Sequence, residues 1–410
     1  MADKSRNISI VVVGGSYAGA VAAKKLADLS KKGYSGLKVT LVDEKSHYFH
    51  AVGFPKALVD AKYAEKAFLP FASFFENDSP HQFVNSRLKL ITDAHHLELE
   101  NGQQLYYDYL LLATGGKAPG PINVSATSKD GGLAEIDQLR VGLQDANSIL
   151  VIGGGAVGVE VAGFVAATFP QKKVTLVHSG KRLLPTNFRE GVSNGAVAKL
   201  GQLDVDVVLN ERVELPDDFG HSAQIGHKVL RGTSGTEYPS DVQILAVGFK
   251  VNSAFLEPLE AKIGSLLHIE DGPGFIRVRP TLQLDSDSFP NIFVAGDAND
   301  LPMTAKYGFK AEMQGGTAAA NIKKLIDTEF DKSFSESRDD VVVPALGKWS
   351  DMVDAIMVPI GPDLGVAQML KVALGCSGIA NFLVRQIKSK DFMLWMRKGY
   401  YPNKQQTNDE

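Results

Sequence analysis

Residues 8–19 have the sequence ISIVVVGGSYAG, and this stretch, together with the helix and strand predicted after it, decides the fold. Its first half is apolar and rich in β-branched residues, which is typical of a strand buried on both faces of a parallel sheet. A pattern of small and apolar residues comes after the glycines, with Ala20, Ala23 and Leu26 spaced to share one helix face. The run Val39–Val42 then predicts a second strand. The stretch therefore predicts a strand–helix–strand unit with a tight glycine turn.

The same arrangement occurs a second time in the chain. Residues 149–158 have the sequence ILVIGGGAVG, and the strand predicted after the next helix is Val174–Val177. That strand has the sequence VTLV, identical to Val39–Val42. Two copies with the same order of strand, glycines, helix and strand predict two nucleotide-binding units, which a single glycine-rich turn would not.

The spacing of the glycines has a physical cause. The first allows a sharp turn from strand to helix, the second lets a pyrophosphate approach the backbone, and the third lets helix and strand pack closely. The phosphates then bind the free N–H groups at the positive end of the helix. The candidate residues are Gly14, Gly15, Ser16, Ala18 and Gly19 in the first copy and Gly153, Gly155 and Gly158 in the second. Ser16 occupies the second glycine position, where its hydroxyl can itself meet a phosphate.

The ends of the second strands differ between the copies. The first ends in Asp43 and Glu44, and an acid at this place accepts hydrogen bonds from an adenosine ribose. The second ends in His178, with Lys181 and Arg182 just beyond it. An acid there would repel a 2′-phosphate, so its absence predicts that NADPH is used as well as NADH.

Two further strands end in polar residues. Residues 109–116 form a buried apolar run that ends in Ala-Thr-Gly, and a similar run ends at Gly248. Residues 291–297 form another, which ends in Gly-Asp. Thr114, Gly115 and Gly248 are candidate cofactor-binding residues. Asp297 has two interpretations, a helix N-cap or a carboxylate that binds the ribityl chain of a flavin.

Taken in order, these segments resemble the two-dinucleotide-binding flavoproteins of the glutathione reductase type. The resemblance covers residues 8–325 and implies an α/β fold of two Rossmann-like domains, with FAD as cofactor and NADH or NADPH as hydride donor. It places a discontinuous FAD-binding domain at residues 1–120 and 250–328 and an NAD(P)-binding domain at residues 121–249. A C-terminal α+β segment, residues 341–410, is expected to cover the flavin and acceptor side.

A narrower resemblance rests on residues 174–179, VTLVHS, and residues 388–392, KSKDF. They are similar to the apoptosis-inducing-factor-like branch, and within it to the ferroptosis suppressor family, which is related to type II NADH dehydrogenases. This resemblance implies an NAD(P)H:quinone oxidoreductase. It also implies catalytic roles for Glu160, Lys388, Phe392 and Met393, with the last two beside the flavin or the acceptor. The alternative is a signalling flavoprotein in which NADH-linked redox state controls conformation.

Four single residues are weighed on this basis. In the resembled family a histidine at the place of His50 lies near the flavin, although a plain loop histidine has the same sequence appearance. Lys306 is either a surface lysine or a residue that touches the flavin. His95 and His96 are neighbours on a predicted strand and point to opposite faces, so no metal site is expected.

Composition narrows the chemistry. A net charge of −4 and a pI near 6.2 argue against a specific nucleic-acid partner. The single cysteine, Cys376, cannot form a redox pair or a zinc site. Electrons are therefore expected to pass directly to an external acceptor, with a quinone, oxygen and a small redox protein left open. The start of the chain has no signal-peptide pattern, and Ala2 stands where N-myristoylation needs glycine.

The C-terminal stretch, residues 371–404, is unusual in composition. It has seven basic residues against Asp391 alone, a local charge of +6, together with five aromatic residues. One interpretation is a structural cover with a solvated basic face. The other is a surface that meets anionic lipid and admits a lipid-soluble acceptor. A cytoplasmic protein, free or peripheral on a membrane such as the mitochondrial outer membrane or a lipid droplet, is expected; a homodimer stays open.

Overall fold

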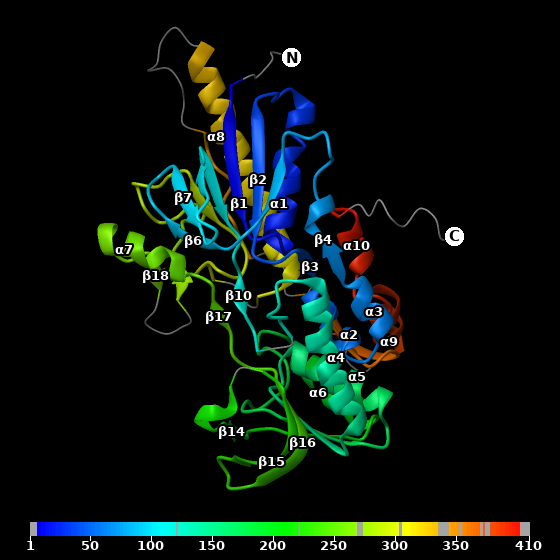
Figure 1. Cartoon of the computed structure of the whole chain (residues 1–410). Helices are drawn as coiled ribbons and strands as arrows, with labels where there is room; N and C mark the ends of the chain where they lie inside the picture. The colour runs from blue at the N-terminus through cyan, green and yellow to red at the C-terminus, as the bar shows by residue number, and fades with distance from the viewer. Residues whose placement is uncertain are drawn as a thin grey trace.

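Two largely parallel sheets form the body of the molecule (Figure 1). The computed structural model describes residues 6–119, 122–220, 222–268, 274–302, 306–334, 344–351, 355–369, 372–373 and 378–401. The first sheet has the order β20-β9-β1-β2-β5, and every neighbouring pair in it is parallel. Its strands are β1 (Ile8–Val13), β2 (Leu37–Asp43), β5 (Gln82–Asn85), β9 (Tyr109–Leu112) and β20 (Ile292–Val294).

Both faces of this sheet are covered, which explains why β1 is apolar apart from Ser9. Ile10 and Val12 belong to a core that includes residues of α1 (Tyr17–Ala27) and α8 (Gly308–Phe334). Val11 and Val13 belong to a second core on the opposite face. That second core includes residues of the small antiparallel sheet β6 (Leu88–Ile91), β7 (His96–Leu99) and β8 (Gln104–Tyr106).

The second sheet repeats the parallel arrangement and adds an antiparallel edge. Its order is β13-β12-β11-β16-β15-β14, with the first four strands parallel. Its strands are β11 (Ser148–Ile152), β12 (Lys173–Val177), β13 (Val205–Val208), β14 (Val213–Glu214), β15 (Gln224–Gly232) and β16 (Glu237–Leu245). Its helices are α4 (Lys129–Asp145), α5 (Ala156–Thr168) and α6 (Glu190–Gly201). The predicted fold class, two Rossmann-like α/β units, is confirmed.

A narrow ribbon joins the two units. β10 (Gly116–Lys117) pairs antiparallel with β17 (Lys250–Val251), and Figure 1 shows this pair between the upper and lower halves. Our proposed division, with residues 1–120 and 250–328 in one domain and residues 121–249 in the other, therefore places both chain crossings at this ribbon.

The C-terminal segment lies against both units. β21 (Ile356–Ile360), β22 (Leu364–Met369) and β23 (Val372–Ala373) form a small antiparallel sheet. β21 packs on α5 and β22 on α6. The chain then forms α9 (Gly378–Val384), a π-helical turn (Arg385–Ser389) and α10 (Leu394–Lys398), drawn in orange to red beside the first unit in Figure 1. Cys376, Lys371 and Lys404 lie outside the described residues.

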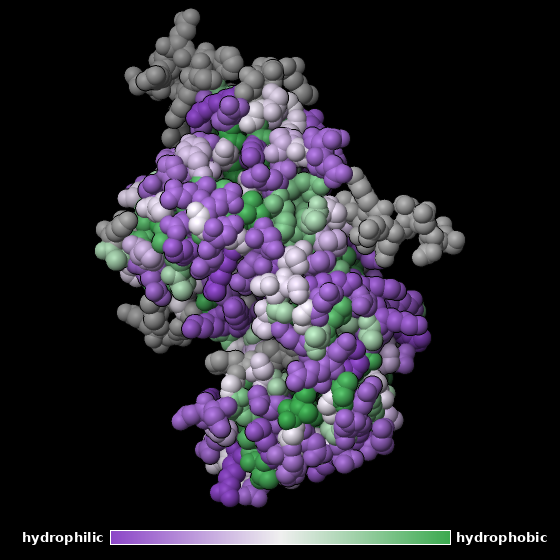
Figure 2. Space-filling view, viewed as in Figure 1, coloured by the Kyte–Doolittle hydropathy of each residue, from purple (hydrophilic) through white to green (hydrophobic). Residues whose placement is uncertain are grey.

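The remaining strands and helices lie outside the two large sheets. They are β3 (His47–Phe49), β4 (Phe68–Pro70), α2 (Phe54–Ala57), α3 (Ala61–Lys66), α7 (Glu257–Ile263), β18 (Leu267–His268) and β19 (Phe275–Ile276). On the face seen in Figure 2, polar side chains predominate and the apolar ones form small scattered groups. Within the described part of the chain, no helix combines the length and the apolar character that crossing a membrane requires.

Candidate functional site

The first glycine turn joins β1 to α1, and at two of its positions the backbone leaves no room for a side chain. Gly14 has a φ of +96°, and a Cβ there would lie 2.3 Å from the carbonyl oxygen of Ala113. A Cβ on Gly19 would lie 1.7 Å from the carbonyl oxygen of Gly14. Ala18 packs under α8, where a Cβ on Gly315 would lie 2.1 Å from its carbonyl oxygen. Only glycine fits at positions 14 and 19, as the spacing predicts.

The second turn, between β11 and α5, repeats this geometry. Gly153 has a φ of +118°, and a Cβ on Gly158 would lie 1.8 Å from the carbonyl oxygen of Gly153. Gly155 differs, because a Cβ there would meet no described atom within 4 Å. The protein leaves this place open, so its glycine suits the close approach of a ligand phosphate.

Ser16 occupies the place of Gly155 in the first turn. It is the N-cap of α1 with φ −82° and ψ −157°, and Gly155 is the N-cap of α5 with φ −69° and ψ −179°. Both are extended backbone that any residue adopts. The Ser16 side chain is exposed and makes no capping hydrogen bond among the described residues. Its hydroxyl is therefore available to a phosphate at the N-terminus of α1.

Asp43 and Glu44, the two acidic residues at the end of β2, have different contacts. Asp43 accepts a hydrogen bond from the backbone N–H of Gly15 at 2.7 Å and another from Lys45 N–H at 2.8 Å. Glu44 instead faces Arg87 on the surface, with 3.6 Å between Oε2 and Nε. Asp43 is thus the acid at the turn. At the second turn, Nδ1 of His178 accepts a hydrogen bond from the Gly154 N–H at 3.1 Å.

Asp297 provides the test of whether a flavin fits. It comes after β20, and its Oδ1 is buried without a hydrogen-bond partner among the described residues. Burial raises the pKa of the Asp297 carboxyl, and the Lys306 ammonium opposes that rise. A buried acceptor with no donor is costly unless a ligand hydroxyl completes it. This orphan oxygen, the exposed Ser16 hydroxyl and the two closed turns fit FAD and NAD(P)H. No helix begins at Asp297, since α8 starts at Gly308.

Lys306 is held inside the same loop. Its Nζ donates to the carbonyl of Asn299 at 2.8 Å and lies 4.7 Å from the centre of the Phe275 ring. Burial lowers the pKa of Lys306, and Asp297 and Asp300 oppose this. Gln314 of α8 fixes the loop as well, because its Oε1 accepts from the N–H of Gly296 at 2.7 Å. Lys306 is therefore a partly buried support of the Asp297 loop, and contact with the flavin stays a prediction.

Thr114 and Gly115 lie at the ribbon between the units. The Thr114 hydroxyl donates to the carbonyl of Asn252 at 2.8 Å, and the Asn252 amide donates back to the Thr114 carbonyl at 2.9 Å. Asn252 N–H also donates to the carbonyl of Gly115, which has a φ of +56°. Gly248 has a φ of +90° in the connection between β16 and β17. These residues fix how the chain crosses between the units, and a direct role in cofactor binding stays a prediction.

His50 lies at the centre of a buried polar group. Its Nε2 donates to the backbone carbonyl of Phe392 at 2.8 Å, because a carbonyl can only accept. Its Nδ1 then accepts from the hydroxyls of Tyr48, at 2.9 Å, and Tyr17, at 3.2 Å. Burial lowers the pKa of His50 to about 4, so the ring is neutral at physiological pH. His50 thereby joins the first unit to the C-terminal segment.

Glu160 and Lys388 form an ion pair between the second unit and the C-terminal segment. Lys388 Nζ donates to Glu160 Oε1 at 2.6 Å and to the carbonyl of Met357 at 2.8 Å. The two side chains are only 4% and 12% exposed, so water screens the pair weakly. Burial raises the pKa of Glu160, and Lys388 opposes this. Glu160 is on the first turns of α5, next to Gly158.

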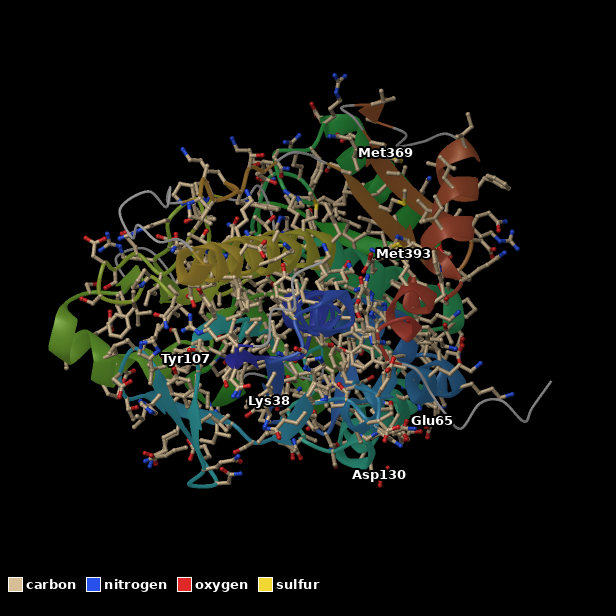
Figure 3. All side chains as sticks on the ribbon, turned by 90° about the horizontal axis from the view of Figure 1, so that it is seen from above. Lys38, Glu65, Tyr107, Asp130, Met369 and Met393 are labelled. Carbon is tan, nitrogen blue, oxygen red and sulfur yellow. The ribbon has the colours of Figure 1, made fainter. Side chains whose placement is uncertain are left out.

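Phe392 and Met393 occupy a strained corner before α10. Both have positive φ angles, 52° and 62°, which are uncommon for residues other than glycine. The Phe392 ring is fully buried between Phe164 and Tyr63, with ring centres 5.5 and 6.4 Å away. Met393, labelled in Figure 3 where the C-terminal helices meet the first unit, is half-buried. Of the two side chains, Met393 is the one left partly accessible.

Sequence reasoning missed several residues at this site. Tyr17, Tyr48 and Arg397 surround His50 or the first turn, and Tyr401 reaches the turn from the far end of the chain. Tyr17 was detectable, since it comes directly after Ser16, and Tyr48 lies only two residues before His50. Arg397 and Tyr401 carry no local pattern, because their roles depend on contacts across hundreds of residues.

The described residues show no group of three or more acidic, histidine or cysteine side chains placed to hold a metal ion. His95 Nδ1 donates to the carbonyl of Tyr107 at 3.0 Å. His96 Nδ1 lies 3.0 Å from Asp93 Oδ1. The two rings therefore have separate partners.

Comparisons with known proteins show the family to which the chain belongs. Residues 8–315 match the family model described as pyridine nucleotide-disulphide oxidoreductase. Apoptosis-inducing factor homolog B of Dictyostelium discoideum is 27% identical over 94% of this chain and 94% of its own length. Ferroptosis suppressor protein 1 of Homo sapiens is 29% identical over 78% of this chain and 81% of its own.

A solved structure shows the same fold over nearly the whole chain. The sulfide:quinone oxidoreductase of Aquifex aeolicus superposes with a TM-score of 0.68 at 18% identity, over 96% of this chain and 92% of that chain. The predicted resemblance to the apoptosis-inducing-factor-like branch is thus confirmed, and so are the predicted cofactors. Since the family model spans both turns and the Asp297 loop, the chain belongs to the pyridine nucleotide-disulphide oxidoreductases, with FAD as its cofactor and NAD(P)H as hydride donor.

Proposed function

We propose that this chain is an NAD(P)H:quinone oxidoreductase that passes electrons to a quinone at the junction of its three parts. Bound FAD supplies the chemistry that accepts a hydride and hands electrons on. The protein supplies binding, orientation and exclusion of water. Members of this fold that reduce disulfides need a cysteine pair, and a chain with one cysteine cannot provide it. An external acceptor must therefore be reduced directly.

The observation that carries the proposal is the way the C-terminal segment closes the junction. Lys388 binds Glu160 beside the NAD(P) turn, and four residues later the Phe392 carbonyl binds His50 of the first unit. The same segment leaves the half-buried, apolar Met393 directly after the second anchor. An apolar side chain in a segment held by buried polar contacts suits a flat quinone head with two carbonyl oxygens.

Lys388 has a defined part in this arrangement. An ammonium carries three N–H bonds, and two of those on Lys388 are directed at Glu160 and Met357. Among the described residues the third has no hydrogen-bond acceptor, and the ammonium lies 5.6 Å from the centre of the Phe392 ring. We propose that this N–H serves an acceptor oxygen, where a fixed cation stabilises developing negative charge. Glu160 holds the ammonium in place and keeps its charge compensated. We therefore assign Lys388 as the group that faces the acceptor and Glu160 as its positioning partner.

The test compares Lys388→Met with Lys390→Met, which removes an exposed lysine two residues away. We expect Lys388→Met to keep its FAD and to be bleached by NADH without oxygen. Its steady-state turnover with a soluble quinone should fall about 100-fold, as for the loss of one preorganised donor. Lys390→Met should match the wild type. Undiminished quinone turnover in Lys388→Met would remove the lysine from the acceptor site.

The proposal extends to a contact with anionic membranes, where quinones are stored. Around α9 and α10, large apolar side chains stand in water: Ile379 is 63% exposed, Phe382 62% and Trp395 66%. Lys390 and Lys398 are exposed on the same segment. Amphipathic surfaces of this composition bind lipid headgroups, with about 1 kcal/mol from each basic residue near an anionic surface.

Vesicle binding tests this part. The triple change Ile379→Ala, Phe382→Ala and Trp395→Ala should reduce sedimentation with phosphatidylcholine vesicles that contain phosphatidylserine. The matched control changes three exposed apolar residues of the second unit, Val141→Ala, Ile225→Ala and Val229→Ala. The control should bind as the wild type does. Equal binding by both variants would show that the C-terminal segment is only a cover.

A second candidate function is a signalling flavoprotein, which the names of the Dictyostelium relatives favour. In that role NADH would set the conformation, and turnover would be incidental. Turnover with a soluble quinone distinguishes the two, since about one per second or more suits an ordinary enzyme. A long-lived complex with NADH and almost no turnover would favour signalling.

A further inference from the structure

The last described residue of the chain, Tyr401, is buried against the first glycine turn. It is only 1% exposed, and its hydroxyl donates to the backbone carbonyl of Gly15 at 2.6 Å. Its ring stacks on Tyr48 with centres 5.1 Å apart and 20° between the planes, and meets Phe74 edge-on at 5.2 Å. A tyrosine that is buried against a glycine turn 386 residues earlier in the sequence needs an explanation.

Arg397 of α10 anchors the same segment four residues earlier. It is 7% exposed and forms an ion pair with Glu312 of α8. Its guanidinium lies 5.6 Å from the centre of the Tyr17 ring, on the first residue of α1. α10 therefore contacts both helices that flank the first turn.

The second turn shows what this contact does. Gly154 corresponds to Gly15, and its carbonyl accepts a backbone N–H, that of Leu184, at 2.8 Å. In both turns the N–H of this glycine donates to a side chain at the end of the second strand, Asp43 or His178. The two peptide units that meet at this glycine are thus each held by one hydrogen bond in both turns. Of the two turns, only the first has a side chain as the donor to the glycine carbonyl, and this side chain comes from a residue 386 positions away.

We infer that Tyr401, supported by Arg397, is a flavin-retaining residue that holds the FAD-binding turn in its binding shape from the C-terminal end of the chain. The phenol stands at Gly15 and beside Asp43, the acid to which turns of this kind bind the adenosine ribose. Burial raises the pKa of Tyr401 well above its usual value, with a further rise from Asp43. The hydroxyl is accordingly always protonated and always a donor.

The contact acts through the shape of the turn. Asp43 holds the Gly14–Gly15 peptide through the N–H of Gly15, and Tyr401 holds the Gly15–Ser16 peptide through the carbonyl of Gly15, so neither peptide can rotate without breaking its hydrogen bond. The N–H groups at the start of α1, which come next, are those a pyrophosphate binds. Loss of the phenol leaves the Gly15 carbonyl without this donor and frees the Gly15–Ser16 peptide to turn. Flavin should then dissociate faster, with no change to any group in the quinone proposal.

Tyr401→Phe tests the inference, because it removes one oxygen and keeps the ring. Tyr400→Phe is the matched control, since Tyr400 is half-buried and contacts Arg397 from outside the turn. The readouts are the affinity of apo-protein for added FAD and the rate of FAD release, both followed by flavin fluorescence. We expect Tyr401→Phe to weaken FAD binding about 3- to 10-fold, the net worth of one hydrogen bond. Tyr400→Phe should leave it unchanged.

Thermal unfolding of the apo- and FAD-bound forms separates binding from folding. If Tyr401 retains flavin, Tyr401→Phe lowers the extra stability gained from a fixed excess of FAD, which falls as the affinity falls. If both forms lose the same stability and FAD affinity is unchanged, Tyr401 is a packing residue and the inference is overturned. Truncation after Gly399, compared with truncation after Tyr401, gives a second test. The shorter chain should release FAD faster than the longer one, and equal release rates would also overturn the inference.

Discussion

The two glycine turns have nearly the same backbone but are held in different ways. Gly14 and Gly153 take the same left-handed conformation, and Gly19 and Gly158 close on the preceding carbonyls within 0.1 Å of each other. The second turn is bounded by His178 and by the backbone N–H of Leu184, both in the nearby chain. The first is bounded by Asp43 and by a tyrosine from the other end of the protein.

This difference suits two ligands that remain bound for different lengths of time. A backbone donor in a local loop makes the NAD(P) turn self-contained, as a site that binds and releases its ligand at each turnover requires. The FAD turn instead depends on Tyr401, a residue near the C-terminus in sequence. A contact of this kind suits a cofactor that remains bound between turnovers. The comparison therefore predicts distinct consequences when each turn is damaged.

The largest effects are expected from the third glycine of each turn. A valine at position 19 or 158 forces a side chain into the carbonyl of Gly14 or Gly153, because even a Cβ would lie within 1.8 Å of it. Gly19→Val should yield protein without flavin, and Gly158→Val should yield yellow protein that NADH no longer bleaches. Gly201→Ala is the control, since a Cβ there meets no described atom within 4 Å. Flavin loss in both valine variants would show that the turns do not bind separate ligands.

The next effect in size concerns Asp297, which has no counterpart in the second unit. Asp297→Ala removes the buried acceptor and leaves a ligand hydroxyl unpaired, at a cost of about 1–3 kcal/mol, or roughly 5- to 150-fold in FAD affinity. Asp287→Ala, an exposed aspartate ten residues earlier, should bind FAD normally. Equal affinities measured by titration of the two apo-proteins would exclude Asp297 from the flavin site.

The two turns also show how far sequence alone could go. The glycines, the strands and Asp43 were predictable, because local periodicity and the order of strand, glycines, helix and strand identify them. The ion pair of Glu160 with Lys388 was anticipated only as two separate candidate residues. Their contact joins positions 228 apart in the chain, and no local pattern encodes such a distance.

The charge of residues 371–404 shows the same limit of prediction from sequence. The sequence count of +6 treats every basic residue of the segment as surface. In the structure Lys388 and Arg397 turn inward and are neutralised by Glu160 and Glu312. A composition counts charges but cannot tell which of them find a buried partner. Of the described basic residues in the segment, Lys390 and Lys398 are exposed without an acidic partner, whereas Arg385 is exposed but paired with Asp363. The described residues therefore offer less free positive charge to a membrane than the sequence count implied.

A smaller effect is expected from making the second turn resemble the first. His178→Asp keeps an acceptor for the Gly154 N–H, as Asp43 does for Gly15, and adds a negative charge where a 2′-phosphate would lie. Burial lowers the pKa of His178, so the wild-type ring is neutral at pH 7 and does not repel the phosphate. The ratio of kcat/KM for NADPH to that for NADH should fall about tenfold, roughly 1.4 kcal/mol. An unchanged ratio would show that His178 does not face the 2′ position.

The smallest expected effect belongs to Ser16, the one position where the turns differ in their own sequence. Its backbone is extended, so neither glycine nor alanine would relieve strain there. If the hydroxyl donates to a phosphate, Ser16→Ala and Ser16→Gly should both weaken FAD binding by about 0.5–1.5 kcal/mol, because each loses the same hydrogen bond. If instead the serine is only tolerated beside the pyrophosphate, Ser16→Gly should bind FAD as tightly as the wild type or more tightly, since it removes the Cβ that stands in the way. Titrating the three apo-proteins with FAD under one set of conditions distinguishes these outcomes. Equal weakening in both variants would make the hydroxyl the substitute for the close backbone approach that Gly155 leaves open in the second turn.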